Sequence, residues 1–324
     1  MTSRWTSSPL LFLSAAIWGF AFVAQRAGME HLGPFTFNAV RFAVGGIVLL
    51  PLVMMRGRRD AAAGSKRSST GTRGILRGSL AAGLVLFAGA SLQQTGIVYT
   101  TAGKAGFITG LYVIIVPLAG LLWKQRTGAQ TWLGAVLAVA GLYFLSLSGG
   151  LGVARGDLLV LLGAFLWAGH VHLIGWLSPR NDPIRLACCQ FLVCSAASLL
   201  AAMITETGIF QTGVFQAGAF KTVTVQGLRG AVLPILYAGL LSTGVAYTLQ
   251  VIAQRRAHPS HAAIILSLEA AFAALGGWLM LGEVLSLREL FGCLLMLAGM
   301  LLSQIDLRPG RILRAGEDAP AGDL

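Results

Sequence analysis

Residues 157–177 read DLLVLLGAFLWAGHVHLIGWL, an apolar run with one acidic residue at its start and two histidines in its second half. A helix of about 20 apolar residues crosses the roughly 30 Å of hydrocarbon in a bilayer. The run shows no strict alternation of polar and apolar residues, and the backbone groups of a segment in lipid must be satisfied internally. This stretch therefore predicts a transmembrane α-helix.

Similar runs recur along the whole 324-residue chain. We expect ten transmembrane helices, at residues 9–26, 34–55, 77–98, 103–123, 129–148, 157–177, 183–204, 231–252, 260–281 and 287–304. Hydrophobic residues make up 56% of the sequence and charged residues only 11%, against about 25% charged residues in ordinary soluble domains. So few charges exclude a disordered chain, a coiled coil and a soluble enzyme domain. The sequence predicts an all-α integral membrane protein.

The basic residues indicate how these helices are oriented. With a cytoplasmic N-terminus, 17 of the 24 Lys and Arg residues fall in cytoplasmic segments and six in the loops on the other side. This bias follows the positive-inside rule, so we expect both termini in the cytoplasm. The net charge of +12 comes from residues between apolar runs, which favours a membrane protein over a nucleic-acid-binding one.

The sequence also contains a weak internal repeat. A shift of 149 residues places Trp18 on Trp167, and a shift of 157 places Gln93 on Gln250. The expected segments are a cytoplasmic N-terminus at 1–8, a first five-helix repeat at 9–148, a second at 157–304 and a cytoplasmic tail at 305–324. Because five is odd, the second repeat is inverted relative to the first. Inverted repeats are the usual architecture of secondary transporters.

Several motifs resemble the drug/metabolite transporter superfamily, in its ten-helix branch with paired EamA-type units. They are Trp18-Gly19, the stretch PFTFNAVR at 34–41, the stretch SLEAAFAA at 267–274, Gly277-Trp278, Leu281-Gly282-Glu283, Gly292 and Ala298-Gly299. The resemblance covers residues 9–304. It implies an inner-membrane carrier whose cavity is supplied mainly by the first, third, fourth, sixth, eighth and ninth helices. It does not fix the substrate, because members carry amino acids, sugar-derived compounds and cationic toxins.

Glu269 is the only carboxylate well inside an expected span, and Arg41 is the only cation. A charge near the bilayer centre costs about 3 kcal/mol on insertion scales. Glu269 is therefore a candidate for binding a substrate amine or a proton, with a protonated, hydrogen-bonded structural role as the alternative. Arg41 cannot readily lose its charge. It snorkels to the outer face, pairs structurally, for example with Glu269, or binds a substrate carboxylate.

Gln93 and Gln250 occupy matching repeat positions, which suits a binding site near the bilayer midplane. Tyr247 lies three residues before Gln250 and shares its helix face. Trp18 and Trp167 also match, and neither lies near the end of its span. They are candidate aromatic walls of a cavity, including one that holds a cation. Interhelical hydrogen bonding by the amides and core packing by the tryptophans are the structural alternatives.

Tyr112 falls at the repeat position of Glu269, so both should face the cavity if either does. His170 shares a helix face with Trp167 and is a candidate proton-carrying group. His172 lies about 200° further round the helix, so the two histidines cannot both reach one metal ion. No acidic residue or cysteine stands at a ligand spacing beside them, and we expect no metal site. No P-loop is present to couple transport to ATP.

These observations predict a secondary transporter rather than an enzyme, with no cofactor. We expect alternating-access export of amino acids or related metabolites across the inner membrane, either coupled to protons through Glu269 or uncoupled. Multidrug or toxic-cation efflux is the second expectation. An intramembrane enzyme would need a nucleophile–base pair or a metal set within the spans, and a scaffold would not need matched polar residues. The expected partners are a small-molecule substrate and the lipid bilayer, without nucleic acid, for a monomer or homodimer.

Overall fold

The computed structural model describes residues 2–62, 71–100, 102–122, 124, 128–146, 155–206, 224–281 and 286–304. Every element in this part of the chain is helical, which confirms the expected all-α class. The elements are α1 (Thr2–Gly28), α2 (Pro34–Ala62), α3 (Gly71–Tyr99), α4 (Ala102–Gly110), α5 (Tyr112–Leu122), α6 (Ala129–Ser146), α7 (Arg155–Leu177), η1 (Ser178–Arg180), α8 (Pro183–Thr205), α9 (Val225–Gly230), α10 (Val232–Leu236), η3 (Tyr237–Tyr247), α11 (Thr248–Ala253), α12 (Pro259–Leu266), α13 (Glu269–Leu281) and α14 (Leu287–Gln304). The expected tail at 305–324 lies outside the described residues.

Eight of the described stretches are long and apolar enough to cross a bilayer. They are Ser7–Gly28, Pro34–Arg58, Gly74–Tyr99, Ala105–Leu122, Arg155–Arg180, Pro183–Thr205, Val232–Ala253 and Pro259–Met280. Two further apolar stretches, Ala129–Gly141 and Leu290–Gly299, are shorter. They fall within the fifth and tenth expected spans. The described residues therefore form a multi-pass membrane protein with eight full-length spans by this criterion, where the sequence predicted ten.

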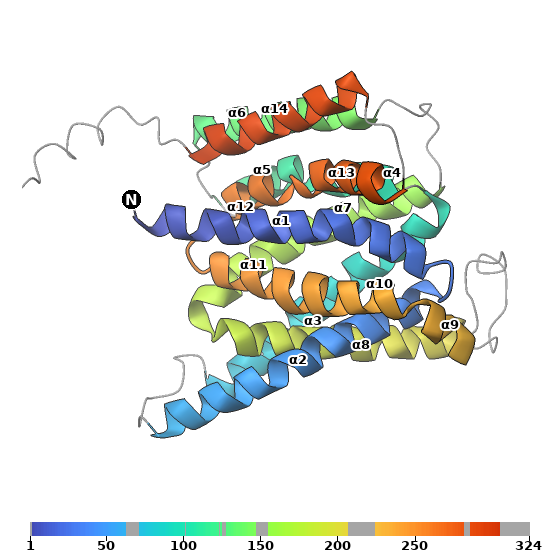
Figure 1. Ribbon diagram of the computed structural model, residues 1–324. Helices are drawn as coiled ribbons and strands as arrows, with labels where there is room; N and C mark the ends of the chain where they lie inside the picture. The colour runs from blue at the N-terminus through green and yellow to red at the C-terminus, as the bar shows by residue number, and fades with distance from the viewer. Residues whose placement is uncertain are drawn as a thin grey trace, which may run out of the picture.

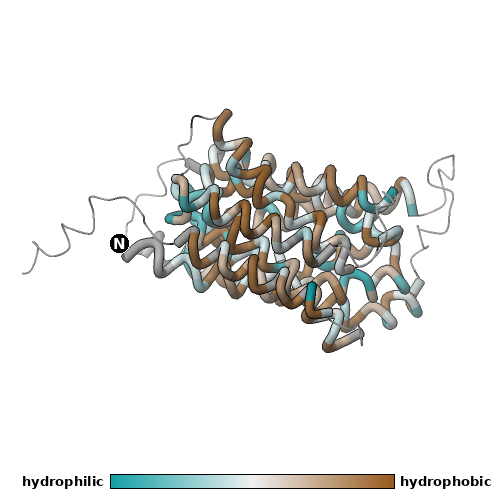
Figure 2. Tube along the Cα trace, turned by 90° about the horizontal axis from the view of Figure 1, so that it is seen from above, coloured by the Kyte–Doolittle hydropathy of each residue, from teal (hydrophilic) through white to brown (hydrophobic). Residues whose placement is uncertain are grey.

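The long helices run side by side in one bundle (Figure 1). α6 packs with α14 along one side and α2 packs with α8 along the opposite side, with α1 and the pieces α4, α5, α12 and α13 between them. Hydrophilic residues gather at the two ends of the bundle and hydrophobic residues fill the length between them (Figure 2). Outward-facing side chains such as Ile47, Val136 and Met280 are more than half exposed, as expected of a surface in lipid.

Polar contacts fix both ends of the α2–α8 pair. Glu206, which follows α8, accepts hydrogen bonds from the backbone N–H groups of Phe35 (2.8 Å) and Thr36 (3.0 Å) in the first turn of α2. At the other end Arg56 of α2 lies 3.3 Å from Asp182, the N-cap residue of α8. In both places a carboxylate meets N–H groups that the first turn of a helix leaves without intrahelical partners. The pair is therefore joined at its two ends as well as along its length.

Three spans have irregular backbone near their middle. α4 ends at Gly110 and α5 begins at Tyr112, while α12 ends at Leu266 and α13 begins at Glu269. In a third span η3 is a π-helix of 11 residues between α10 and α11, a conformation that rarely exceeds one turn. Irregular backbone at membrane depth is tolerated where it is buried in protein or lines a cavity. These irregularities therefore point to the place of the functional site.

Candidate functional site

A cavity borders the irregular segments of the bundle; its empty volume is about 480 Å³ when the space open to solvent is included. This central cavity is lined by Trp18, Phe22, Gln25, Arg41, Gln93, Thr109, Tyr112, Trp167, His170, Val171, Ser242, Tyr247, Gln250, Leu266 and Glu269. The expected first, third, fourth, sixth, eighth and ninth helices all contribute, and Arg41 adds the second.

All nine candidates predicted from the sequence lie around this cavity. They are Trp18, Arg41, Gln93, Tyr112, Trp167, His170, Tyr247, Gln250 and Glu269. Four further lining residues, Phe22, Gln25, Thr109 and Ser242, could not be predicted from the sequence. Single amides and hydroxyls are common in membrane spans, where they hydrogen-bond neighbouring helices. Nothing in the local sequence distinguishes Gln25, Thr109 and Ser242 from that ordinary use.

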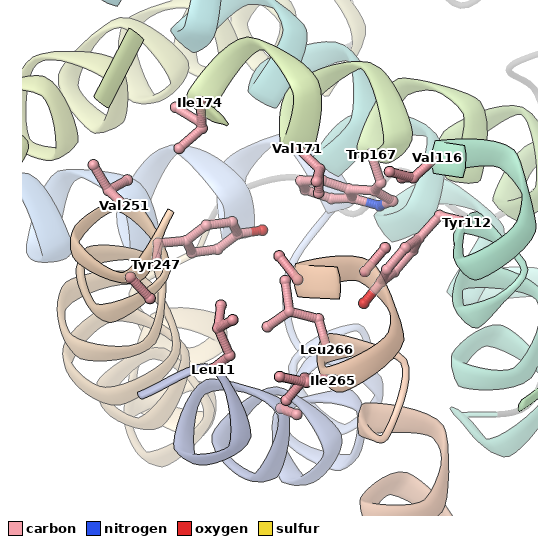
Figure 3. Close-up of a cluster of buried hydrophobic side chains, with 14 of the residues drawn as sticks. Leu11, Tyr112, Val116, Trp167, Val171, Ile174, Tyr247, Val251, Ile265 and Leu266 are labelled. Atoms are coloured by element: carbon pink, nitrogen blue, oxygen red, sulfur yellow. The ribbon is translucent and has the colours of Figure 1, made fainter. Parts of the chain in front are cut away.

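Aromatic rings form one wall of the central cavity around Tyr247. Its ring centroid lies 4.5 Å from that of Trp18, 6.1 Å from that of Trp167 and 5.9 Å from that of Phe191. Tyr247 and Tyr112 lie on opposite sides of Leu266 in the close-up (Figure 3). Tilted and edge-to-face contacts at these distances stabilise aromatic packing. The wall is thus a rigid apolar surface beside a few polar groups.

The Gln93 amide is held in place by its neighbours. Trp167 Nε1 donates a hydrogen bond of 2.7 Å to Gln93 Oε1, and Thr109 Oγ1 donates a longer one of 3.5 Å to the same oxygen. Gln93 Nε2 in turn donates to Gln25 Oε1 at 3.4 Å. This network joins α1, α3, α4 and α7. It supports the interhelical hydrogen-bonding role that the sequence left open for Gln93.

Gln250 and Trp18, the repeat counterparts of Gln93 and Trp167, are arranged differently. Gln250 Oε1 is buried and has no hydrogen-bond partner among the described residues. Trp18, the repeat counterpart of Trp167, donates instead to the backbone oxygen of Ser242 at 3.2 Å. Ser242 belongs to the π-helix η3. The amide of Gln250 is therefore free to contact a molecule in the cavity, whereas that of Gln93 is already engaged.

Arg41 is buried, with 2% of its surface exposed, so the expected snorkelling to the outer face does not occur. Its Nε donates to Asn38 Oδ1 at 2.8 Å, and its guanidinium carbon lies 4.6 Å from the ring centre of Phe42. No described carboxylate forms an ion pair with it, which also corrects the expected pairing with Glu269. No described residue accepts a hydrogen bond from its two terminal nitrogens. A buried guanidinium with free donors thus lines the cavity.

Glu269 is the first residue of α13, and Tyr112 is the first residue of α5. Both are buried and both line the central cavity. Neither the Tyr112 hydroxyl nor Glu269 Oε1 has a hydrogen-bond partner in the described part of the chain. The cavity therefore holds an acceptor at Glu269 and donors at Arg41, which do not pair with each other.

The two histidines of α7 point to different partners. His170 lines the cavity, and its Nε2 lies 3.0 Å from Gln190 Oε1. His172 Nε2 lies 2.8 Å from the backbone oxygen of Val116. The described residues contain no group of three His, Cys, Asp or Glu side chains that could hold a metal ion. This geometry leaves His170 as the histidine of the site.

Comparison with known proteins shows which family the chain is similar to. The model of the EamA-like transporter family matches residues 6–147 and 154–304. An uncharacterized transporter of Archaeoglobus fulgidus is 30% identical over 293 residues, which are 90% of this chain and 83% of that protein. The uncharacterized inner membrane transporter YedA of Escherichia coli is 30% identical over 50% of this chain and 51% of its own length. One crystal structure superposes with a TM-score of 0.67 and 18% identity, covering 97% of this chain and 99% of that one, and so shows the fold.

Proposed function

Because this chain belongs to the EamA-like transporter family, we propose that it carries a small metabolite across the bilayer through the central cavity by alternating access. The named relatives point to a transporter family rather than to an enzyme. Membrane-spanning helices in such a family imply a small-molecule substrate and a lipid bilayer. The cavity, walled by residues of both halves of the chain, supports this site.

The proposal treats the two halves as inverted repeats, with both termini in the cytoplasm. The repeat shift of 157 residues places Leu111 on Leu268 and Tyr112 on Glu269. The interruption between α4 and α5 thus corresponds to the interruption between α12 and α13. Broken helices at matching positions of two halves are typical of transporters whose halves rock about a midplane site. The excess of basic residues in the proposed cytoplasmic segments supports the orientation.

We further propose that the substrate is an amino acid or a related compound with both an amine and a carboxylate. The observation that carries this proposal is that a guanidinium group, Arg41, and a carboxyl group, Glu269, line one cavity without pairing. A buried ion without a partner is costly. A zwitterion would supply a carboxylate to the free guanidinium donors and an ammonium group to the Glu269 carboxylate. Tyr247 lines the same cavity as both side chains.

Efflux from proteoliposomes tests this function. Vesicles loaded with labelled amino acids are diluted, and loss of label is followed for the wild type and for Gln250→Ala. We expect efflux of one or more amino acids, slowed in the variant, because Gln250 offers a free amide to the cavity. Folded wild-type protein that carries none of the amino acids would contradict the proposal.

Proton coupling through Glu269 is part of the proposal. Glu269→Gln should abolish flux driven by a pH gradient and preserve exchange of labelled for unlabelled substrate. Glu206→Gln is the matched control, because it removes another buried carboxylate that does not line the cavity. Unchanged pH-driven flux in Glu269→Gln would show that coupling does not use this residue.

A second candidate function is efflux of toxic or drug-like cations. The rings of Trp18, Trp167 and Tyr247 beside the Glu269 carboxylate favour it, because aromatic faces and a carboxylate attract cations. The unpaired Arg41 guanidinium in the same cavity disfavours it. Transport of cationic dyes without transport of amino acids would select this function.

Location, direction and assembly complete the proposal. We place the protein in the inner membrane, which the name of the YedA relative supports, and we propose export as its direction. The central cavity is lined by one chain, so a monomer suffices, while a homodimer remains compatible with it.

A further inference from the structure

A second cavity lies at the cytoplasmic end of the bundle in the proposed orientation. It has about 870 Å³ of empty volume including its open side. Its walls are formed by Ser7, Leu10, Pro179, Ile252, Ala253, Arg255 and Arg256. These residues lie at or just beyond the ends of the spans Ser7–Gly28, Arg155–Arg180 and Val232–Ala253. We name this open space the end cavity.

One buried apolar layer lies between the end cavity and the aromatic wall of the central cavity. Leu10 and Ile252 line the end cavity, and their chain neighbours Leu11 and Val251 are fully buried. Leu11 and Val251 belong to the hydrophobic cluster that also contains Tyr247 of the central cavity. Figure 3 shows Val251 beside Tyr247 on the side away from Tyr112, and Leu11 below Tyr247 in the view. This layer is placed to act as the barrier between the two spaces.

The corresponding place in the other half of the chain is closed. The repeat shifts place Ala253 on Gly96 and Ser7 on Gly156. A Cβ atom added to Gly156 would lie 2.6 Å from the backbone oxygen of Gly96, so α3 and α7 touch backbone to backbone there. Nearby, Thr100 Oγ1 donates a hydrogen bond of 2.6 Å to Asp157. The structure is therefore open between α1 and α11 at one end and sealed between α7 and α3 at the other.

The end cavity carries two positive charges that have no counterpart in the other half of the chain. Arg255 and Arg256 are exposed, and no described carboxylate forms an ion pair with either. Their repeat counterparts are Val98 and Tyr99, which are uncharged. A concave site lined by charge of one sign raises the local concentration of oppositely charged solutes. The arginines are thus placed to act on a solute entering from the cytoplasm.

We propose that the end cavity is a cytoplasmic vestibule in which Arg255 and Arg256 attract carboxylate-bearing solutes before they pass Leu11 and Val251 to reach Arg41. The proposal rests on the proposed function for its solute and on the proposed orientation for its side. It adds an entry site, separate from the central cavity, that selects anionic groups. It also assigns this structure to an inward-occluded state, in which the vestibule is open and Leu11 and Val251 close the central cavity.

Thiol modification tests the vestibule without requiring transport. Ile252→Cys is labelled in inside-out vesicles with an anionic reagent, 2-sulfonatoethyl methanethiosulfonate, and with a cationic one, 2-(trimethylammonio)ethyl methanethiosulfonate. The wild type supplies the background rate of its own cysteines, of which Cys188 and Cys194 are buried and Cys189 is partly exposed. Replacing both Arg255 and Arg256 with glutamine should lower the ratio of the labelling rate by the anionic reagent to that by the cationic reagent at least about threefold. The reason is that both charges lie within roughly one electrostatic screening length of the labelled thiol.

The matched control is Arg58→Gln combined with Arg77→Gln, which removes two other exposed arginines of the same side and should leave the ratio unchanged. Thr95→Cys, the repeat counterpart of Ile252→Cys, should react slowly with both reagents in right-side-out vesicles. An unreactive Ile252→Cys, or a ratio that does not change when Arg255 and Arg256 are replaced, would overturn the proposal.

A lipid phosphate is the competing occupant of the two arginines. The labelling is repeated in vesicles of phosphatidylcholine alone and of phosphatidylcholine with phosphatidylglycerol. A vestibule for soluble carboxylates predicts that the arginine effect persists in both. An effect abolished by phosphatidylglycerol would assign the arginines to a lipid headgroup and overturn the proposal.

A transport readout separates failure of the vestibule from failure of the proposed function. With an amino acid shown to be carried, the double replacement of Arg255 and Arg256 should raise the KM for the cytoplasmic side and leave kcat unchanged. Charge-selective labelling without amino-acid transport would keep the vestibule and reject the substrate. Transport with an unchanged KM would keep the proposed function and reject the vestibule.

Discussion

Replacing Arg41 with glutamine separates a binding role from a structural role. A side chain that holds the fold together should cost stability when removed. A side chain kept for a ligand should not, because functional residues are often unfavourable for stability. Arg41 is the sharpest case in the site, since it is almost fully buried and has no acidic partner in the described chain.

The expected change follows from the contacts of the guanidinium group. Removing an ion from water costs several kcal/mol. The charge-assisted hydrogen bond to Asn38 offsets about 1.5–3 kcal/mol, and the contacts with Phe37 and Phe42 offset about 0.5–2 kcal/mol each. These contributions nearly cancel. Arg41→Gln keeps an amide donor for Asn38, so the free energy of unfolding should stay constant or rise by up to about 2 kcal/mol.

The assay combines thermal unfolding with amino-acid efflux. Arg41→Gln should melt within about 5 °C of the wild type or above it, and lose efflux of carboxylate-bearing substrates. Arg26→Gln is the matched control on α1. Arg26 donates to the backbone oxygens of Ile97 (2.8 Å) and Val98 (3.1 Å) and does not line the cavity, so its removal should lower stability slightly and preserve efflux. A large loss of stability in Arg41→Gln with efflux intact would refute the reasoning.

Three further predictions concern the rest of the structure. Trp167→Phe removes the 2.7 Å hydrogen bond to Gln93 and should lower the unfolding free energy by about 1–2 kcal/mol. Thermal melting measures the change, and an unchanged melting temperature would show that this hydrogen bond does not contribute to stability. Gly156→Ala places a Cβ atom 2.6 Å from the backbone oxygen of Gly96 and should lower the unfolding free energy by about 1–3 kcal/mol. A Cβ atom added at Gly169, on the same helix, meets nothing within 4 Å, so Gly169→Ala should leave the stability unchanged. Equal losses of stability in the two variants would refute this packing argument. Burial raises the pKa of the Glu206 carboxyl group above 4.5, so the folded state favours the neutral acid. The melting temperature of the wild type, relative to that of Glu206→Gln, should therefore fall as the pH rises from 4.5 through the raised pKa. A difference between the two melting temperatures that does not change with pH would contradict this.

Much of the site could be predicted because polar groups in lipid are costly and therefore conspicuous. Glu269 and Arg41 stood out as charges inside spans, and Gln93 and Gln250 stood out as matched amides. The structure brings them to one cavity. Hydrophobic length likewise located the long spans, since apolar runs of this size have few alternatives to crossing a bilayer.

The remainder depends on helix contacts that the sequence does not encode locally. The sequence left Arg41 three roles: snorkelling, structural pairing or binding a substrate carboxylate. The structure buries it inside the bundle against the rings of Phe37 and Phe42. The π-helix η3 packs against α1 and α2, contacts that the local sequence does not reveal. Its residue Ser242 accepts a hydrogen bond from Trp18, whereas Trp167 donates to Gln93, although the two tryptophans match in sequence.

Binding of three related compounds tests the central claim most directly. The amino acid that most stabilises the purified protein against heat is compared with its carboxamide, which lacks the carboxylate, and with its des-amino acid, which lacks the amine. A ligand at ten times its Kd stabilises the protein by about 1.4 kcal/mol, which shifts the melting curve measurably. The account predicts that only the compound with both charged groups binds, because Arg41 and Glu269 each need a partner. Equal binding of the carboxamide, or binding of cationic dyes alone, would contradict it.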